Sequence, residues 1–309
     1  MATTNVRTAT WNNIGTDISE MKDVSQILKA TNLDYDVITL PAGFIREKGV
    51  EDPQFYATDH RFTVKADTHE PISVVSNKYV PVQNRDAFAF VDYVAGEDES
   101  FKFVKAGETK SHFVYIIGKT SPINVLGDEI TPYIIFSNSH DGRSSVRATI
   151  TPLRIVCNNQ FRIAFRESPN TVYVRHDSNA MVKLDDAQKV LSSLNSYMHT
   201  FTSEAENLAT SRLSKDNAIK IFNSLFDKQN MTLRQQNHTE NMRNQFISAY
   251  EADDNQNFQN TAWGAINAAS DFITHKEGRK TTDDNKFMSV TFTSPFLQQF
   301  LMSVISVSV

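Results

Sequence analysis

The apolar residues of this chain change their spacing near residue 180. Before that point they recur in short runs with a period of two, as in RFTVKAD, where Phe62, Val64 and Ala66 alternate with polar residues. After it they recur every three or four residues, as in LDDAQKVLSSLNSYMHTF. A period of two is typical of half-buried strands, and a period near 3.6 is typical of amphipathic helices. The sequence therefore predicts an α+β protein with a sheet first and helices last.

The stretch before residue 180 predicts a twisted, mostly antiparallel sheet with helices packed on it. SFKFVKAG and SHFVYIIGK predict a hairpin around Gly107, and DAFAFVDYV (86–94) predicts a helix that Asp86 caps. We expect two regions: a mixed α/β core over residues 1–180, and a mainly helical region over residues 181–309. The second region packs on the core or mediates oligomerisation, and Ser214 caps one of its helices.

The composition is that of a globular chain and excludes several kinds of site. Of 309 residues, 40% are hydrophobic, and the net charge is −5, so any anion-binding surface must be local. The single cysteine, Cys157, can form neither an internal disulfide nor a cysteine-based zinc site. The absence of a GxxxxGK[ST] loop argues against an NTP-driven motor. Because MATTNVRTATWNN lacks a secretory apolar region and no apolar run approaches about 18 residues, we expect a cytoplasmic protein without a membrane span.

Arginines gather in one stretch of this acidic chain. From Arg143 to His176 there are six arginines, no lysine and one acid, Glu167, which is a local excess of five positive charges. Arginine suits planar, two-pronged contact with phosphate and can also stack on bases. Outward arginines on a half-exposed strand can equally be solvated, or paired with acids elsewhere in the chain. The shortage of local acids favours a polyanion as the ligand.

The spacing within this stretch predicts a strand, a tight turn and a helix. In SSVRATI the apolar residues alternate with Arg147, and Pro152 interrupts or ends the strand before LRIVC resumes it. Asn158 and Asn159 are candidate caps of the following helix, whose first-turn N–H groups, flanked by arginines, form an anion site. The predicted nucleic-acid contacts are Arg143, Arg147, Arg154, Arg162, Arg166, Arg175, Asn158, Asn159 and Tyr173, with Lys102, Lys105 and Lys110 on the neighbouring hairpin as secondary contacts.

Two other candidate sites fit structural roles better than chemical ones. The pair His140-Asp141 resembles the metal-binding pair of phosphohydrolases, but it precedes Gly142, and Asp-Gly is typical of a turn. Cys157 lies in the apolar run RIVC and is expected to be a buried thiol rather than a nucleophile. We therefore predict no catalytic residue, no metal and no cofactor.

Three aromatic residues are expected to be exposed. Tyr79, beside Lys78, and Tyr173 can offer stacking surfaces for single-stranded bases. Phe44, in the loop-like stretch LPAGFIREKG, can do the same or contact a neighbouring subunit.

Four stretches together resemble one family. They are NIGTDISEMKDVSQIL (13–28), YVPVQNRDAFAFVD (79–92), FSNSHDGRSSVRATITPLRIVCNN (136–159) and TAWGAINAASDFITH (261–275). In this order they resemble the phage/plasmid-like protein family built on domain of unknown function 932. Arg143 departs from the family pattern, in which small residues follow the His-Asp-Gly turn, and Gln160 replaces the usual threonine after the Asn pair. The resemblance implies an origin in a mobile element and a setting in the host cytoplasm, but no activity.

These observations lead to one leading hypothesis and two rivals. The first is a phage nucleic-acid-binding protein of recombination or replication, a single-strand binding or annealing protein that forms a homo-oligomer. Arginines would hold the phosphates and aromatic rings would stack on the bases. The second is a protein-binding inhibitor of a host defence system, whose partner is a host protein. The third is a metal-dependent nucleic-acid enzyme that uses His140 and Asp141.

Overall fold

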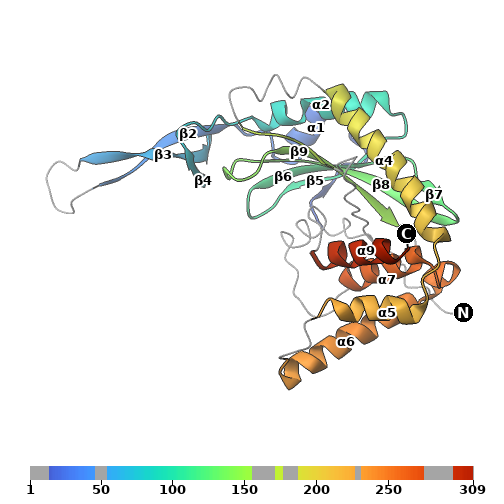
Figure 1. Ribbon diagram of the computed structural model, residues 1–309. Helices are drawn as coiled ribbons and strands as arrows, with labels where there is room; N and C mark the ends of the chain where they lie inside the picture. The colour runs from blue at the N-terminus through green and yellow to red at the C-terminus, as the bar shows by residue number, and fades with distance from the viewer. Residues whose placement is uncertain are drawn as a thin grey trace, which may run out of the picture.

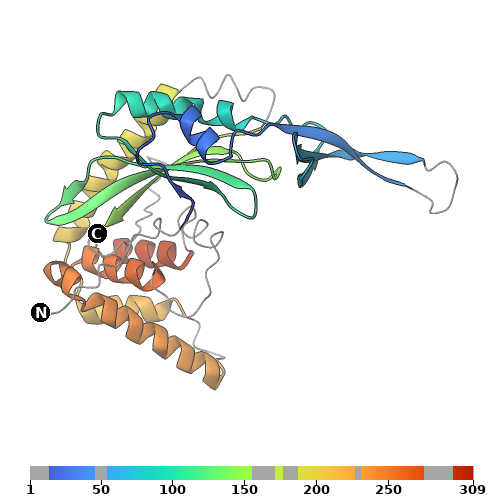
Figure 2. The same ribbon diagram turned by 180° about the vertical axis from the view of Figure 1, so that it is seen from behind.

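The computed structural model describes residues 14–45, 54–154, 171–176, 187–226, 231–274 and 295–308. These residues form an antiparallel sheet with helices packed on it, a smaller sheet that projects away from it, and a group of helices towards the C-terminus (Figures 1 and 2). The predicted α+β fold is confirmed. The change of apolar period near residue 180 separates the strands from the helical part of the chain.

The main sheet contains seven described strands, and its pairs are antiparallel. Their order is β1-β5-β6-β8-β9-β10, and β7 pairs with β8. Their bounds are β1 Thr16–Asp17, β5 Lys102–Glu108, β6 Phe113–Lys119, β7 Ile123–Val125, β8 Asp128–Ser139, β9 Val146–Arg154 and β10 Thr171–Val174. The last residue of β10 pairs with Val146, the first residue of β9. The turn between β8 and β9 therefore lies at the same end of the sheet as the residues that follow β10.

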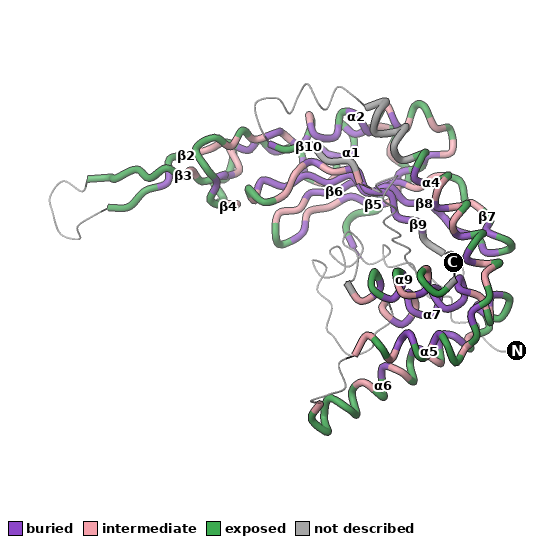
Figure 3. The backbone as a smooth tube through the Cα atoms, in the orientation of Figure 1, coloured by how far each residue is buried: buried purple, intermediate pink, exposed green. Residues whose placement is uncertain are grey.

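A second antiparallel sheet, here called the arm, consists of β2 Val37–Ile45, β3 Phe55–Lys65 and β4 Pro71–Ser76. It extends away from the main sheet (Figure 1), and much of it is exposed (Figure 3). Hydrogen bonds join it to the end of β8, because the hydroxyls of Thr63 and Ser73 donate to the carbonyls of His140 and Asp141. Its exposed large apolar side chains are Ile38, Leu40, Phe44, Ile45, Phe55, Tyr56, Phe62 and Val74.

Some helices cover one face of the main sheet, and the C-terminal helices form a separate group on the other side of the sheet (Figures 1 and 2). α1 and α2 lie on the sheet, and α4 runs from beside them towards the C-terminal helices (Figures 1 and 2). The described helices are α1 Val24–Ala30, α2 Asn84–Glu97, α4 Ala187–Thr210, α5 Lys215–Ser224, α6 Leu233–Tyr250, the 3₁₀ helix η2 Asp253–Phe258, α7 Ala262–Thr274 and α9 Pro295–Ser308. None of them is both long and apolar enough to cross a membrane.

Alternation along β8 divides its side chains between the two faces of the sheet. Ile134 and Phe136 belong to the large core that also includes α1, α2 and the C-terminal helices. Tyr133 and Ile135 belong to a smaller cluster, which the alternation places on the opposite face. Asn138 continues the even-numbered series, and its amide donates to the Val82 carbonyl at 3.1 Å. This hydrogen bond holds the start of α2 against the end of β8.

The predicted hairpin forms between β5 and β6, but the predicted position of its turn and the predicted cap of α2 are wrong. Gly107 lies inside β5, opposite Tyr115, and the turn falls between β5 and β6 instead. A Cβ at Gly107 would lie 2.8 Å from the Tyr115 hydroxyl, so the glycine permits a close approach rather than a turn. The cap of α2 is Gln83 and not Asp86, which lies in the first turn. The Gln83 side chain instead pairs with the backbone of Val37 at 2.8 and 3.0 Å.

Pro152 does not interrupt β9, contrary to expectation. The strand runs from Val146 to Arg154 and sets Pro152 directly opposite Pro132 of β8. Neither proline has an N–H, so this pair lacks the mutual hydrogen bonds that some antiparallel pairs form. Because the two prolines face each other, the missing N–H groups fall at one pair, and the neighbouring pairs of β8 and β9 still form.

One prediction about the helical region is confirmed. Ser214 caps α5, and its hydroxyl accepts from the Asn217 amide at 3.3 Å. The last helix, α9, buries Phe300 and Val304 in the large core.

Candidate anion-binding pocket

An open pocket of about 780 Å³ lies at the end of the main sheet, where the arm meets it. Three chain segments that are far apart in sequence form it: the link from β4 to α2, the turn from β8 to β9, and the end of β10. The residues that line it are Ser76, Lys78, Tyr79, Gly142, Arg143, Ser144, Ser145, Arg147, Thr171, Arg175 and His176.

Four basic side chains and no carboxylate occur among the described residues of this lining. Lys78, Arg143 and Arg175 are exposed and form no ion pair with any residue that the structure describes. Arg147 is half-buried, and its Nε donates to the Ser145 hydroxyl at 3.5 Å. The pocket is therefore a local positive region on an acidic chain.

The turn between β8 and β9 presents Arg143 to the pocket. The Asp141 carboxylate accepts hydrogen bonds from the backbone amides of Arg143 (2.9 Å) and Ser144 (2.8 Å) and from the Ser144 hydroxyl (3.2 Å). Gly142 has φ +75°, a left-handed conformation that glycine adopts without strain. The predicted Asp-Gly turn is confirmed, and the Asp141 carboxylate forms its hydrogen bonds within this turn.

The inner wall of the pocket is aromatic. Tyr79 stacks on His176 with 5.2 Å between ring centroids, and His140 meets His176 edge to face at 5.4 Å. The Tyr79 hydroxyl lies 3.4 Å from Nδ1 of His140, and the Val82 amide donates to Nδ1 of His176 at 3.2 Å. Tyr79 was expected to be exposed, but it is half-buried because its ring packs on His176.

Burial keeps both imidazoles neutral at neutral pH. It lowers the pKa of His176 to about 4, against the opposing attraction of the Asp141 carboxylate. It lowers the pKa of His140 to about 3, and the neighbouring His176 adds to that effect. Because Nδ1 of His176 accepts from Val82, the neutral ring carries its proton on Nε2. Within the described part of the chain, this buried Nε2 has no hydrogen-bond partner.

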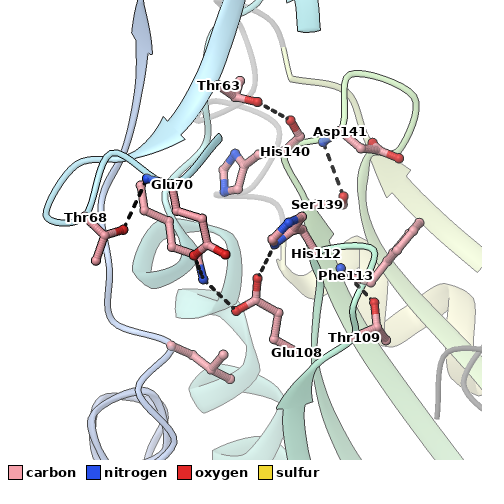
Figure 4. A network of polar contacts seen from close by, with 12 residues as sticks. Thr63, Thr68, Glu70, Glu108, Thr109, His112, Phe113, Ser139, His140 and Asp141 are labelled. Atoms are coloured by element: carbon pink, nitrogen blue, oxygen red, sulfur yellow. Dashed lines mark hydrogen bonds and ion pairs between the residues drawn. The ribbon is translucent and has the colours of Figure 1, made fainter. Parts of the chain in front are cut away.

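In a second cluster of charged residues near His140, acidic side chains balance the positive charge (Figure 4). Lys65 of β3 forms ion pairs with Glu70 at 3.2 Å and with Glu108 at 3.3 Å. Glu108 also contacts Nδ1 of His112 at 2.8 Å. Since acids surround Lys65, this cluster offers no excess positive charge to an anion.

Three of the predicted arginines come together in the pocket. Arg143, Arg147 and Arg175 all line it, because the register of β9 and β10 brings the two ends of the arginine stretch to the same end of the sheet. Arg154 is at the opposite end of β9, paired with Ile130, and Tyr173 is paired with Arg147. The predicted contacts Arg162, Arg166, Asn158 and Asn159 lie outside the described residues, as does Cys157.

The three predicted lysine contacts do not line the pocket. Lys105 is buried and forms an ion pair with Asp17 at 3.1 Å, so it cannot serve as an open phosphate contact. Hydrogen bonds from Ser19, together with Lys105, lower the pKa of Asp17 to about 2. Lys102 at the start of β5 and Lys110 in the turn after it are exposed elsewhere.

Lys78 and His176 are among the pocket residues that were not predicted as ligand contacts. Lys78 lies outside the arginine stretch, and His176 carries no motif that distinguishes it from other histidines. Their nearness depends on strand pairing between segments about a hundred residues apart, which local spacing does not show. Among the described residues, no group of three His, Cys, Asp or Glu side chains could hold a metal ion.

Fold and pocket together define a class: an α+β protein with an antiparallel sheet whose end carries a cation-lined pocket. Within that class, the chain belongs to the family described as Domain of unknown function (DUF932), whose model matches residues 71–290. This range contains every residue that lines the pocket, and it confirms the family membership that the sequence predicted. No curated protein and no solved structure matches the chain.

Proposed function

We propose that this protein binds single-stranded nucleic acid and acts in phage recombination or replication as a single-strand binding or annealing protein. The observation that carries the proposal is the convergence of Lys78, Arg143, Arg147 and Arg175 on one open pocket whose described lining has no carboxylate. Arginine and lysine so arranged contact phosphate oxygens and require no particular base sequence.

The local character of the charge supports a specific site rather than a general attraction. The chain carries a net charge of −5, so its overall field repels a polyanion, and binding must depend on the pocket. Lys78, Arg143 and Arg175 are exposed and unpaired within the described residues, so they lose no internal ion pair when they bind phosphate.

The arm, whose strand β4 borders the pocket, also carries exposed aromatic surface towards its far end. Phe44 stacks on Tyr56 with 5.6 Å between ring centroids, and both rings are exposed. Val74 and Val75 of β4 line a second pocket that shares Gly142 and Arg143 with the first. Exposed rings on an arm that begins beside a basic pocket suit the bases of a strand held there, because the faces of bases stack without sequence preference.

The proposal is tested by binding of a fluorescent oligodeoxythymidine across a salt series. Affinity falls steeply with salt, and Arg143→Ala and Arg175→Ala each make the slope of log K against log salt shallower by about 0.7. The matched control is Arg234→Ala, since Arg234 is exposed on α6 and does not line the pocket. Absence of binding at low salt, or an equal loss in the control, contradicts the proposal.

One observation favours a second candidate, a protein-binding inhibitor of a host defence system. The exposed apolar side chains of the arm form a surface suited to another protein. On that candidate the arm contacts a host protein and the pocket has no part in binding, so the oligonucleotide does not bind even at low salt.

A further inference from the structure

One hydrogen-bond donor in the pocket wall has no partner among the residues that the structure describes. His176 is a buried residue with 9% of its surface exposed, and its Nε2 contacts no acceptor among the described residues. The other ring nitrogen, Nδ1, is occupied by the Val82 amide. Buried polar groups almost always have a partner, and the exceptions in native proteins include sites that a ligand completes.

The position of this donor is fixed on three sides. Tyr79 stacks on the ring at an interplanar angle of 16°, His140 packs against it at 67°, and Val82 holds Nδ1. His140 is itself held, because the Asn138 amide lies 3.4 Å from its Nε2. A donor held in this way does not have to reorient its own ring to meet an acceptor.

The charges around the donor indicate the kind of acceptor. Lys78, Arg143 and Arg175 line the same pocket as His176. The nearest acid of the turn, Asp141, already accepts three hydrogen bonds from its own turn. A neutral N–H among several cations suits an anion that carries more than one oxygen, so that one oxygen meets the imidazole and the others meet the guanidinium groups.

We propose that the pocket holds the terminal phosphate of a nucleic-acid strand, with the Nε2–H of His176 as a direct donor to one phosphate oxygen. This inference rests on the proposed function and names the part of the strand that the pocket takes. An internal phosphodiester has one charge and two unbridged oxygens, whereas a terminal phosphate has close to two charges and three such oxygens. The terminal group therefore matches several convergent cations and a buried donor better than the internal one does.

Two substitutions separate the donor from the rest of the ring. In His176→Asn the shorter amide replaces Nδ1 as the acceptor for Val82 and places nothing at Nε2. In His176→Gln the longer side chain places its amide near the position of Nε2. Asparagine therefore removes the donor to the phosphate, and glutamine restores it.

The test compares three oligodeoxythymidines of one length that carry a 5′-phosphate, a 3′-phosphate or hydroxyl groups at both ends. Unlabelled strands compete with a labelled hydroxyl-ended strand for the full-length protein. We expect one phosphorylated strand to bind about tenfold more tightly than the hydroxyl-ended strand. His176→Asn reduces this preference severalfold, His176→Gln retains most of it, and Arg234→Ala leaves it unchanged.

The outcomes distinguish this inference from the proposed function. Equal affinity of the three strands for the unsubstituted protein overturns the terminal-phosphate site and leaves single-strand binding intact. Absence of binding by any strand overturns both. If folded His176→Asn keeps the full preference for the phosphorylated strand, His176 does not contact the phosphate. If that variant does not fold, a full preference in Arg175→Ala shows that the pocket is not the phosphate site.

Discussion

Acid should destabilise this protein through His176, whose ring is buried in the neutral form. Burial lowers its pKa to about 4 in the folded chain, against the ordinary histidine value of 6.5 in the unfolded chain. The unfolded chain therefore binds more protons than the folded chain between these two values, and stability falls as the pH falls. The contribution is fully present above pH 6.5, decreases below it, and stops changing near pH 4.

The two pKa values set the size of the effect. From pH 7 to pH 5, the difference in proton binding at His176 lowers the free energy of unfolding by about 2 kcal/mol. His140, whose pKa is lowered to about 3, also makes the folded chain less stable as the pH falls. The cause in both cases is burial, since a charged imidazole in this wall loses its hydration.

Urea denaturation of the unsubstituted protein and of His176→Asn at pH 7, 6 and 5 measures this effect. Asparagine keeps an acceptor for the Val82 amide but does not titrate, so the difference in stability between the two proteins should shrink by about 2 kcal/mol at pH 5. Carboxylates elsewhere titrate equally in both proteins and cancel in the difference. A difference that stays constant from pH 7 to pH 5 would refute the neutral, buried state of His176.

Two further predictions concern the core and the arm. Asp128→Ala should lower the free energy of unfolding by about 3 kcal/mol, because it leaves the buried indole N–H of Trp263 without the carboxylate that it contacts at 2.9 Å. Thermal or urea denaturation measures it, and Glu129→Ala, at an exposed neighbour, should change little. For the arm, Phe44→Ser should lower the mass of the expected homo-oligomer in light scattering without lowering the melting temperature. Met302→Ser, at an equally exposed apolar position on α9, should leave the mass unchanged, and equal masses for all three proteins contradict a role of the arm in assembly.

Local spacing was enough to predict the class of fold and several of its details. The period of two and the period of three to four each report how one side of an element is buried, and that information lies within a few consecutive residues. The Asp141-Gly142 turn and the Ser214 cap were predicted for the same reason, since both depend on neighbours within three residues. The family membership was also readable, because its motifs are short and ordered along the chain.

Predictions that depended on distant neighbours were wrong or incomplete. Gly107 was assigned to a turn because glycine is common there, whereas the structure uses it to admit the Tyr115 hydroxyl from the next strand. Lys105 was predicted as a secondary phosphate contact because it lies on the hairpin next to the arginine stretch, whereas Asp17 of β1 covers and neutralises it. Each outcome depends on which strand lies alongside, and alternation within one strand does not contain that information.

The sequence by itself determined that positive charge is concentrated between Arg143 and His176, since residue counts require no coordinates. Only the tertiary structure decided where that charge acts. Pairing of β10 with β9 returns Arg175 to the turn that carries Arg143, and the link from β4 to α2 adds Lys78 and the wall that buries His176. The physical reason is that a pocket is a property of chain segments brought together by long-range pairing, whereas composition and period are properties of each segment alone.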